Sequence, residues 1–149
     1  MNSKLPVGVI GVGRMGTIYA GHLARHSQSQ IICVSDVIEE RAQAIAAELG
    51  VESWSTDYRD LLENKAIKAV FVTSSTSTHR EVVMAAAEMK KAIFCEKPIA
   101  LTLEDTDQMI TTIEKNGVMF QAGFMRRFDS GYVAAKEQIE AGAIGKPVT

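Results

Sequence analysis

Three glycines near the start of the chain have the spacing of a phosphate-binding turn. Gly11, Gly13 and Gly16 follow an apolar run at residues 6–10 and precede an amphipathic helical pattern. In this context the first glycine allows a tight turn, the second lets a diphosphate approach the backbone, and the third lets the helix lie close to the strand. The N–H groups and dipole of the helix would then bind the phosphates. We therefore expect residues 11–16 to hold a diphosphate.

A cation lies inside this turn. Arg14 would occupy the first turn of the helix, where a positive charge opposes the helix dipole unless an anion is bound there. The alternative is an arginine that extends into solvent and takes no part in binding. Val12 and Met15 belong to the same turn, and we expect them to contact the molecule that carries the diphosphate.

An acidic residue follows the next apolar run, at residues 30–35. A carboxylate at Asp36 could accept hydrogen bonds from the ribose hydroxyls of NAD, whereas the 2′-phosphate of NADP would meet a like charge. Val37 comes next, so no arginine directly follows Asp36 to receive that phosphate, although Arg41 could reach the adenine edge. The alternative is that Asp36 serves only as a helix N-cap. We expect NAD to be preferred, with Asp36 and Val37 beside it.

A lysine ends a later strand-like run, in the sequence Glu96-Lys97-Pro98. In open α/β sheets the carboxyl ends of the strands border the ligand crevice. Pro98 keeps Lys97 out of helical geometry and permits a cis bond, so the ammonium group is held at this edge. A lysine beside the nicotinamide ring could transfer a proton or steer a substrate hydroxyl. The alternative is an exposed turn lysine without a function.

The elements that would position these residues alternate along the chain. Short apolar runs suit strands that are covered on both faces, and they lie at residues 6–10, 30–35, 69–73 and 92–95, with a further strand expected at 118–122. Strands that alternate with helices are typical of parallel sheets. The sequence therefore predicts an α/β fold of the Rossmann type, with a doubly wound, mainly parallel sheet and helices on both faces.

Helical patterns separate the runs. Residues 39–49 carry one apolar stripe, and Gly50 would end this helix. Thr78 and Glu81 have the spacing of a capping box, which would open the next helix. Thr102 would open another helix, and Gly117 would close it.

The pattern changes around Gly123, where a charged cluster begins. We interpret residues 1–123 as a dinucleotide-binding domain and 124–149 as the beginning of a substrate domain. The second segment contains a helical pattern at 132–141 but is too short for a core of its own, because independent domains rarely fall below about 40 residues. It must pack on the first domain or on another chain.

The composition is that of an ordinary globular protein. Of 149 residues, 46% are hydrophobic and 23% are charged, and the net charge is −2. The cations form no stripe that would bind nucleic acid. No apolar run reaches the roughly 18 residues that span a bilayer, and the first residues lack a secretory pattern. We expect a cytoplasmic protein without a nucleic-acid or membrane partner.

Several other residues suggest chemistry but are expected to be structural. Cys33 and Cys95 lie in apolar runs, as buried thiols do. His22 and His26 are one helical turn apart but have no visible third ligand, so we expect no metal. Two aromatic residues, Trp54 and Tyr58, are expected to cover the sheet edge and not to stack on a base.

Four motifs together resemble the Gfo/Idh/MocA family of oxidoreductases. They are V-I-G-V-G-R-M-G at residues 9–16, T-S-S-T-S-T-H at 73–79, C-E-K-P at 95–98 and G-F-M-R-R-F-D at 123–129. The resemblance covers almost the whole chain. It implies a nicotinamide-dependent dehydrogenase that oxidises a secondary alcohol.

The resemblance also implies residue roles. Lys97 would stand beside the nicotinamide and contact the reacting hydroxyl, as the catalytic or substrate-positioning residue. Arg126 would line the substrate pocket. Four further residues would border the cofactor, namely Ser74, Thr76, His79 and Glu96.

Two departures from the family pattern refine this expectation. Many members have Pro where Ser75 stands and Asn where Ser77 stands, and serine at both positions is similar to the inositol dehydrogenase branch. Myo-inositol or a related polyol or sugar is therefore the expected substrate. In the family, a general-base His preceded by an Asp lies in a larger C-terminal domain, which also builds the oligomer. We expect a homo-oligomer in which residues 1–149 bind NAD but lack the base.

Two other functions share these motifs. A non-catalytic module that senses or regulates through NAD(H) would need the glycine turn and no general base. A methyltransferase could use the same turn for a nucleoside, but it would not explain the Lys97-Pro98 pair.

Overall fold

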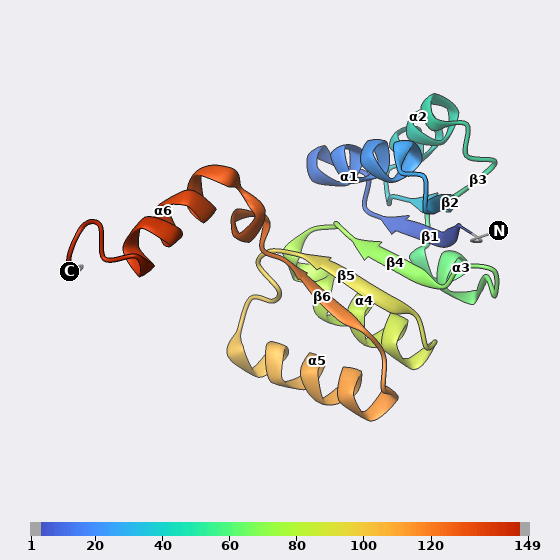
Figure 1. The fold of residues 1–149 in the computed structure, drawn as a ribbon. Coiled ribbons are helices and arrows are strands. Elements are labelled where there is room, and N and C mark those ends of the chain that lie inside the picture. Colours follow the sequence, from blue (N-terminus) through green and yellow to red (C-terminus); the bar gives the residue numbers. More distant parts are fainter. Residues whose placement is uncertain (1–3, 147–149) are drawn as a thin grey trace.

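The computed structural model describes residues 4–146 and contains one six-stranded sheet (Figure 1). Its strands, all paired in parallel, have the order β3-β2-β1-β4-β5-β6. They are β1 (Leu5–Ile10), β2 (Ser29–Ser35), β3 (Ser53–Ser55), β4 (Ala69–Val72), β5 (Ala92–Glu96) and β6 (Phe120–Gly123). This order is that of the doubly wound dinucleotide-binding fold, so the predicted fold class is confirmed.

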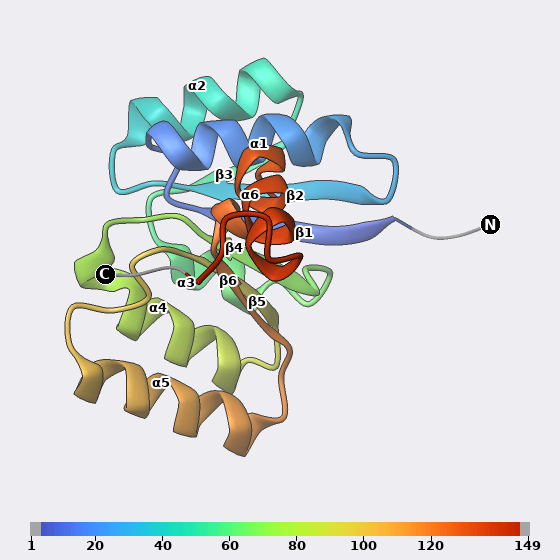
Figure 2. The ribbon, with the colours of Figure 1, turned by 60° about the vertical axis from the view of Figure 1, so that its left-hand side comes forward.

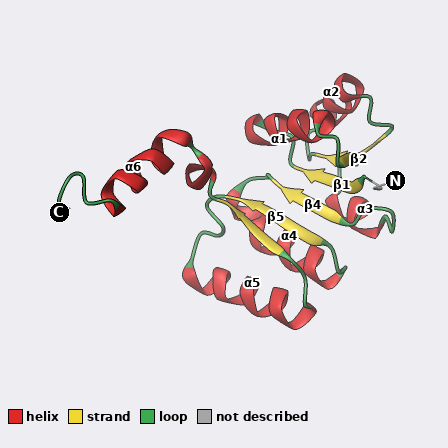
Figure 3. Ribbon diagram, viewed as in Figure 1, coloured by secondary structure: helices red, strands yellow, loops and turns green. Residues whose placement is uncertain are grey.

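Helices cover both faces of the sheet (Figure 2). They are α1 (Arg14–Arg25), α2 (Glu39–Leu49), α3 (Tyr58–Glu63), α4 (Thr76–Glu88) and α5 (Leu103–Asn116). The first two lie on one face, and α4 and α5 lie on the other. Figure 3 shows the regular alternation of strand and helix that produces this arrangement. Because every strand runs the same way, all the carboxyl ends meet at one edge.

The core is divided between the two faces because strand side chains alternate. On β1, Val9 packs in the cluster under α1 and α2, and Ile10 packs in the cluster under α3, α4 and α5. The same alternation places Val34 and Cys33 of β2 in opposite clusters. The continuous apolar runs are therefore buried on both sides, as predicted.

Most predicted helix ends are present. Gly50 and Gly117 follow α2 and α5 in the left-handed conformation, with φ of 65° and 62°. The hydroxyl of Thr102 accepts a hydrogen bond from the N–H of Asp105, at 3.0 Å, and opens α5.

The predicted capping box of Thr78 and Glu81 is wrong. The N-cap of α4 is Ser75, three residues before Thr78, and the helix begins at Thr76. The Thr78 hydroxyl instead donates to the carbonyl of Ser75, at 2.8 Å. Glu81 reaches away from the helix start to accept a hydrogen bond from Tyr58.

Strand β3 was not predicted. It has only three residues, none of them buried, and it pairs with β2 at the edge of the sheet. A segment this short and exposed carries no apolar periodicity. Trp54 lies in this strand at 38% exposure, in agreement with the expected cover of the sheet edge.

The segment after β6 leaves the sheet (Figure 1). A short 3₁₀ helix, η1 (Met125–Phe128), leads into α6 (Ser130–Glu140), which starts two residues before the predicted helix. The carboxylate of Asp129 caps α6 by accepting from the N–H of Gly131 at 3.0 Å. All residues from 124 to 146 are exposed, so this segment does not pack on the sheet domain. Within residues 4–146, the helices lack the length and apolarity needed to cross a membrane.

Candidate functional site

The glycine turn has the geometry that its sequence requires. Gly11 has a φ of 86°, and its N–H donates to the carbonyl of Ser35 at 2.7 Å. A methyl group on Gly16 would overlap with the carbonyl oxygen of Gly11, so this close approach needs glycine. Thr73, after β4, fixes the turn from the other side by donating to the Gly11 carbonyl at 2.7 Å.

The start of α1 is open to a ligand. Gly13 is the N-cap and supplies no side-chain hydrogen bond, and the first turn contains no acidic residue. A methyl group built on Gly13 meets no heavy atom within 4 Å. The first N–H groups of a helix have no partner in the helix itself, and together with the dipole they favour an anion. Arg14 is exposed at this end and Met15 is half-buried beside it.

Asp36 connects the end of β2 to the glycine turn. Its Oδ2 accepts from the N–H of Val12 at 2.9 Å, and its Oδ1 accepts from the N–H of Ile38 at 3.0 Å. The side chain is buried, with 7% exposure, yet each oxygen keeps a lone pair for another donor. The alternative of a helix N-cap is wrong, because Ile38 occupies that position in α2 without a side-chain bond. Val37 is 87% exposed beside it.

A cleft of ≈ 900 Å³ runs along this part of the carboxyl edge. One wall is formed by the glycine turn and Asp36, and another by Ser74 and Ser75 before α4. Val37 also lines it. The cleft therefore brings together the predicted phosphate site, the predicted ribose site and part of the serine- and threonine-rich loop.

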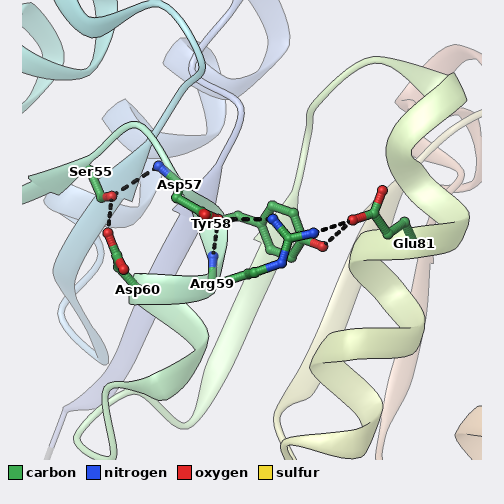
Figure 4. Close-up of polar contacts among 6 residues, drawn as sticks. All are labelled: Ser55, Asp57, Tyr58, Arg59, Asp60 and Glu81. Atoms are coloured by element: carbon green, nitrogen blue, oxygen red, sulfur yellow. Dashed lines mark hydrogen bonds and ion pairs between the residues drawn. The ribbon is translucent and has the colours of Figure 1, made fainter.

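A second group of residues lines the same cleft. Arg59 and Glu81 were not predicted as site residues, and Tyr58, which was expected only to cover the sheet edge, lies in the lining of the cleft. The group comes from the start of α3 and from α4, and Figure 4 shows its contacts. The Tyr58 hydroxyl donates to Oε1 of Glu81 at 2.6 Å, and Nη2 of Arg59 donates to the same oxygen at 2.6 Å. Burial, and then the bond to Glu81, raise the pKa of Tyr58 to about 12.

His79 joins two loops at the carboxyl edge. Its Nε2 lies 3.1 Å from the carbonyl oxygen of Ser74, and its Nδ1 lies 2.9 Å from that of Pro98. The ring is 1% exposed and does not line the cleft. His79 therefore links the loop after β4 to the turn that contains Lys97.

The Glu96-Lys97-Pro98 turn follows β5, and its Lys97–Pro98 peptide is cis. Lys97 is exposed, while Glu96 is 4% exposed. Oε2 of Glu96 accepts from the N–H of Lys97 at 3.0 Å, and Oε1 is buried without a partner among residues 4–146. Burial, with a smaller effect of the Glu96 carboxylate, raises the pKa of Tyr19 on α1.

The structure does not gather every predicted residue in one cavity. Lys97, Glu96 and Arg126 lie on the β5 and β6 side, outside the lining of the cleft. The guanidinium of Arg126 lies over the ring of Tyr132, 4.7 Å from its centroid. Thr76 is the first residue of α4 and is half-buried.

The residues fit a dinucleotide. Open space at Gly13, the uncapped start of α1 and the spare lone pairs of Asp36 suit a diphosphate followed by a ribose. The cleft leads away from this point toward Tyr58, whereas Lys97 lies in the other direction, beyond β4. A bound dinucleotide would thus extend across the point where the strand order reverses, between β1 and β4.

Both cysteines are buried and unpaired, as expected. Burial raises the pKa of Cys33, and burial with the nearby Glu96 raises that of Cys95 to about 12. Within the part of the chain that the structure describes, no three His, Cys, Asp or Glu side chains gather in a way that could hold a metal ion.

Proteins similar to this chain include two inositol dehydrogenases. The chain is 42% identical to scyllo-inositol 2-dehydrogenase (NAD(+)) of Bacillus subtilis, over 99% of its own length and 44% of that protein. It is 45% identical to myo-inositol 2-dehydrogenase of Thermotoga maritima, over 95% of its length and 42% of that protein. The chain therefore spans less than half the length of these relatives.

Solved structures agree with the sequence comparison. The crystal structure of scyllo-inositol dehydrogenase from Lactobacillus casei with bound NAD(H) and scyllo-inositol matches with a TM-score of 0.90 at 32% identity, over 97% of this chain and 43% of that one. Myo-inositol 2-dehydrogenase from Lactobacillus plantarum matches with a TM-score of 0.93 at 32% identity, over 98% and 44%. Finally, residues 5–124 match the family described as "Oxidoreductase family, NAD-binding Rossmann fold", so the chain belongs to the Gfo/Idh/MocA oxidoreductases and carries their NAD-binding domain.

Proposed function

We propose that this chain is the cofactor domain of an NAD-dependent dehydrogenase that oxidises a secondary alcohol of a polyol such as myo-inositol. The observation that carries the proposal is the common edge shared by the glycine turn, Asp36 and Lys97. All three stand at carboxyl ends of parallel strands, on either side of the reversal between β1 and β4. The inositol dehydrogenases among the relatives support the substrate class.

In this proposal residues 11–16 hold the diphosphate. Val12 and Met15 support the turn, and Arg14 faces the anion. Asp36 accepts the ribose hydroxyls, beside Val37. Bound NAD would supply the hydride acceptor. Around it, Ser74 and Thr76 border the cofactor, while His79 and Glu96 hold the turn that contains Lys97.

Lys97 is the proposed catalytic residue. Its ammonium group extends from the edge of β5 and would donate a hydrogen bond to the reacting hydroxyl. Because the Lys97 N–H is bonded to buried Glu96, the backbone at this position is fixed. Arg126 would contact the substrate from the segment after β6.

Residues 124–149 are proposed to begin the substrate domain, and residues 1–123 to form the cofactor domain. The exposed apolar side chains of this segment, including Phe128 and Ile144, support packing against another domain or chain. A homo-oligomer is part of the same proposal. We also propose a cytoplasmic location, because two unpaired thiols suit a reducing compartment.

Titration with NADH tests the cofactor assignment. Binding to the 149-residue chain should increase the fluorescence of NADH, and the signal should reach a plateau as the chain is saturated. NADPH should bind more weakly. No binding of NADH at millimolar concentration would contradict the proposal. If a polypeptide that contains this chain and a complete substrate domain bound NADH but did not oxidise a polyol, the result would favour the alternative of an NAD(H) sensor.

A further inference from the structure

The cleft described above corresponds to the adenosine half of the dinucleotide site, a statement that rests on the proposed function. From the glycine turn it passes Asp36 and ends at the start of α3, on the side away from Lys97. A chain of diphosphate, ribose and base laid in that direction would bring the base to Tyr58, Arg59 and Glu81. These three residues therefore lie where the base would be, in a cleft that Arg41 also lines.

The first property of this group is a flat surface. The guanidinium of Arg59 lies over the ring of Tyr58, 4.7 Å from its centroid. Glu81 on α4 binds both groups, because one oxygen of its carboxylate accepts hydrogen bonds from the Tyr58 hydroxyl and from Arg59 (Figure 4). Planar groups held in this way can stack with a purine ring.

The second property is a free acceptor. Oε1 of Glu81 accepts two hydrogen bonds, whereas Oε2 accepts none within residues 4–146, and Figure 4 shows it without a contact to the residues drawn. A carboxylate oxygen is only an acceptor, so it favours a donor on the base. Adenine presents an exocyclic amino group, which donates, whereas an unsubstituted purine has only a carbon-bound hydrogen at the same position.

We propose that Glu81 is a specificity-determining residue that selects adenine by accepting a hydrogen bond from its exocyclic amino group, while Tyr58 and Arg59 form the surface on which the base stacks. A purine that has only a hydrogen in place of the amino group offers the carboxylate no donor at this edge. The ion pair between Arg59 and Glu81 contributes little to folding, because both side chains are exposed to solvent. Its substitution therefore reports on binding.

The test compares NADH with its analogue in which unsubstituted purine replaces adenine, and with reduced nicotinamide mononucleotide, each titrated into the 149-residue chain. The wild type should bind NADH about five- to tenfold more tightly than the purine analogue, as expected for one hydrogen bond to a charged, partly exposed group. Glu81→Gln should bring this ratio close to one. Glu88→Gln, at the other end of α4, is the matched control and should leave the ratio unchanged.

A second variant tests the stacking surface. Tyr58→Leu should weaken both dinucleotides by a similar factor and leave the mononucleotide, which has no base in this cleft, unaffected. Equal binding of the two dinucleotides to the wild type, or an unchanged ratio in Glu81→Gln, would overturn the role of Glu81. Tighter NADH binding in Glu81→Gln would instead identify the Arg59–Glu81 pair as an obstacle to the base. Absence of any NADH binding to the wild type would overturn the proposed function itself.

Discussion

The carboxylate of Asp36 accepts a hydrogen bond from the backbone N–H of Val12, with 2.9 Å between Oδ2 and the nitrogen. This bond joins the end of β2 to the turn after β1, 24 residues away in the sequence. One side chain thus fixes the phosphate turn and places an acceptor beside it. The proposed ribose and diphosphate sites are therefore one structural unit.

Replacement of Asp36 tests the choice between NAD and NADP. Asp36→Ala removes the proposed ribose acceptor and the like charge that opposes a 2′-phosphate, so NADH affinity should fall about tenfold or more while NADPH loses less. Asp36→Asn keeps one oxygen and should have an intermediate effect. Fluorescence titration measures both affinities, and an equal loss for the two cofactors would refute the ribose assignment.

Substitution of two glycines of the turn should have different effects, one on cofactor binding and the other on stability. Gly13→Ala should fold normally, because its methyl group meets no heavy atom within 4 Å, but it should bind NADH at least tenfold more weakly, because the methyl group occupies the phosphate position. Gly16→Ala should instead lower the free energy of unfolding by about 3 kcal/mol through overlap with Gly11. Urea unfolding and NADH titration separate the two effects. Normal NADH binding by Gly13→Ala would place the phosphates elsewhere.

Lys97 should affect turnover and not cofactor binding. Because residues 124–149 are proposed to be only the beginning of a substrate domain, activity is measured in a chimera that joins residues 1–124 to the remainder of the Bacillus subtilis relative. In this chimera Lys97→Met should lower kcat for inositol oxidation at least a hundredfold, in the range of general acid–base catalysis, with NADH affinity within about twofold. Lys115→Met, an exposed site at the end of α5, is the control. A fully active Lys97→Met chimera would exclude the catalytic role.

Because the thiol of Cys95 is buried, we expect the protein to lose stability at alkaline pH. Its pKa is raised from 9.0 to about 12 in the fold, so the folded state favours the neutral thiol. This contribution to stability is fully present below pH 9.0 and is lost as pH rises toward 12. The unfolding free energy should therefore fall over that range, and less steeply in Cys95→Ala. The folded thiols should also resist a disulfide reagent that reacts rapidly after unfolding, and equal rates in both states would contradict their burial.

Much of the fold could be predicted because the apolar runs are buried on both faces and therefore stand out in the sequence. The runs that became β1, β2, β4 and β5 were placed to within a residue or two at each end. Left-handed glycines and Thr102 gave correct helix ends because their effect is local. The start of α4 was placed wrongly because all six residues from 73 to 78 are Ser or Thr and therefore able to serve as a cap. The Glu81 side chain, which would complete the predicted capping box, instead accepts a hydrogen bond from Tyr58.

The site was predictable where one turn supplies it and not where distant segments meet. The glycine motif and Asp36 are local signals with a known spacing. The contact of Tyr58 with Glu81 joins residues 23 apart in the sequence, on two helices, and follows no periodic pattern. Likewise, the link from His79 to Pro98 depends on the packing of α4 against the turn after β5.

A crystal structure of the chain with NADH would locate the cofactor directly. The diphosphate should lie within hydrogen-bond distance of the N–H groups at the start of α1, with the adenosine ribose on Asp36 and the nicotinamide beside Lys97. A cofactor bound at the opposite edge of the sheet, or a diphosphate remote from Gly13, would contradict this arrangement.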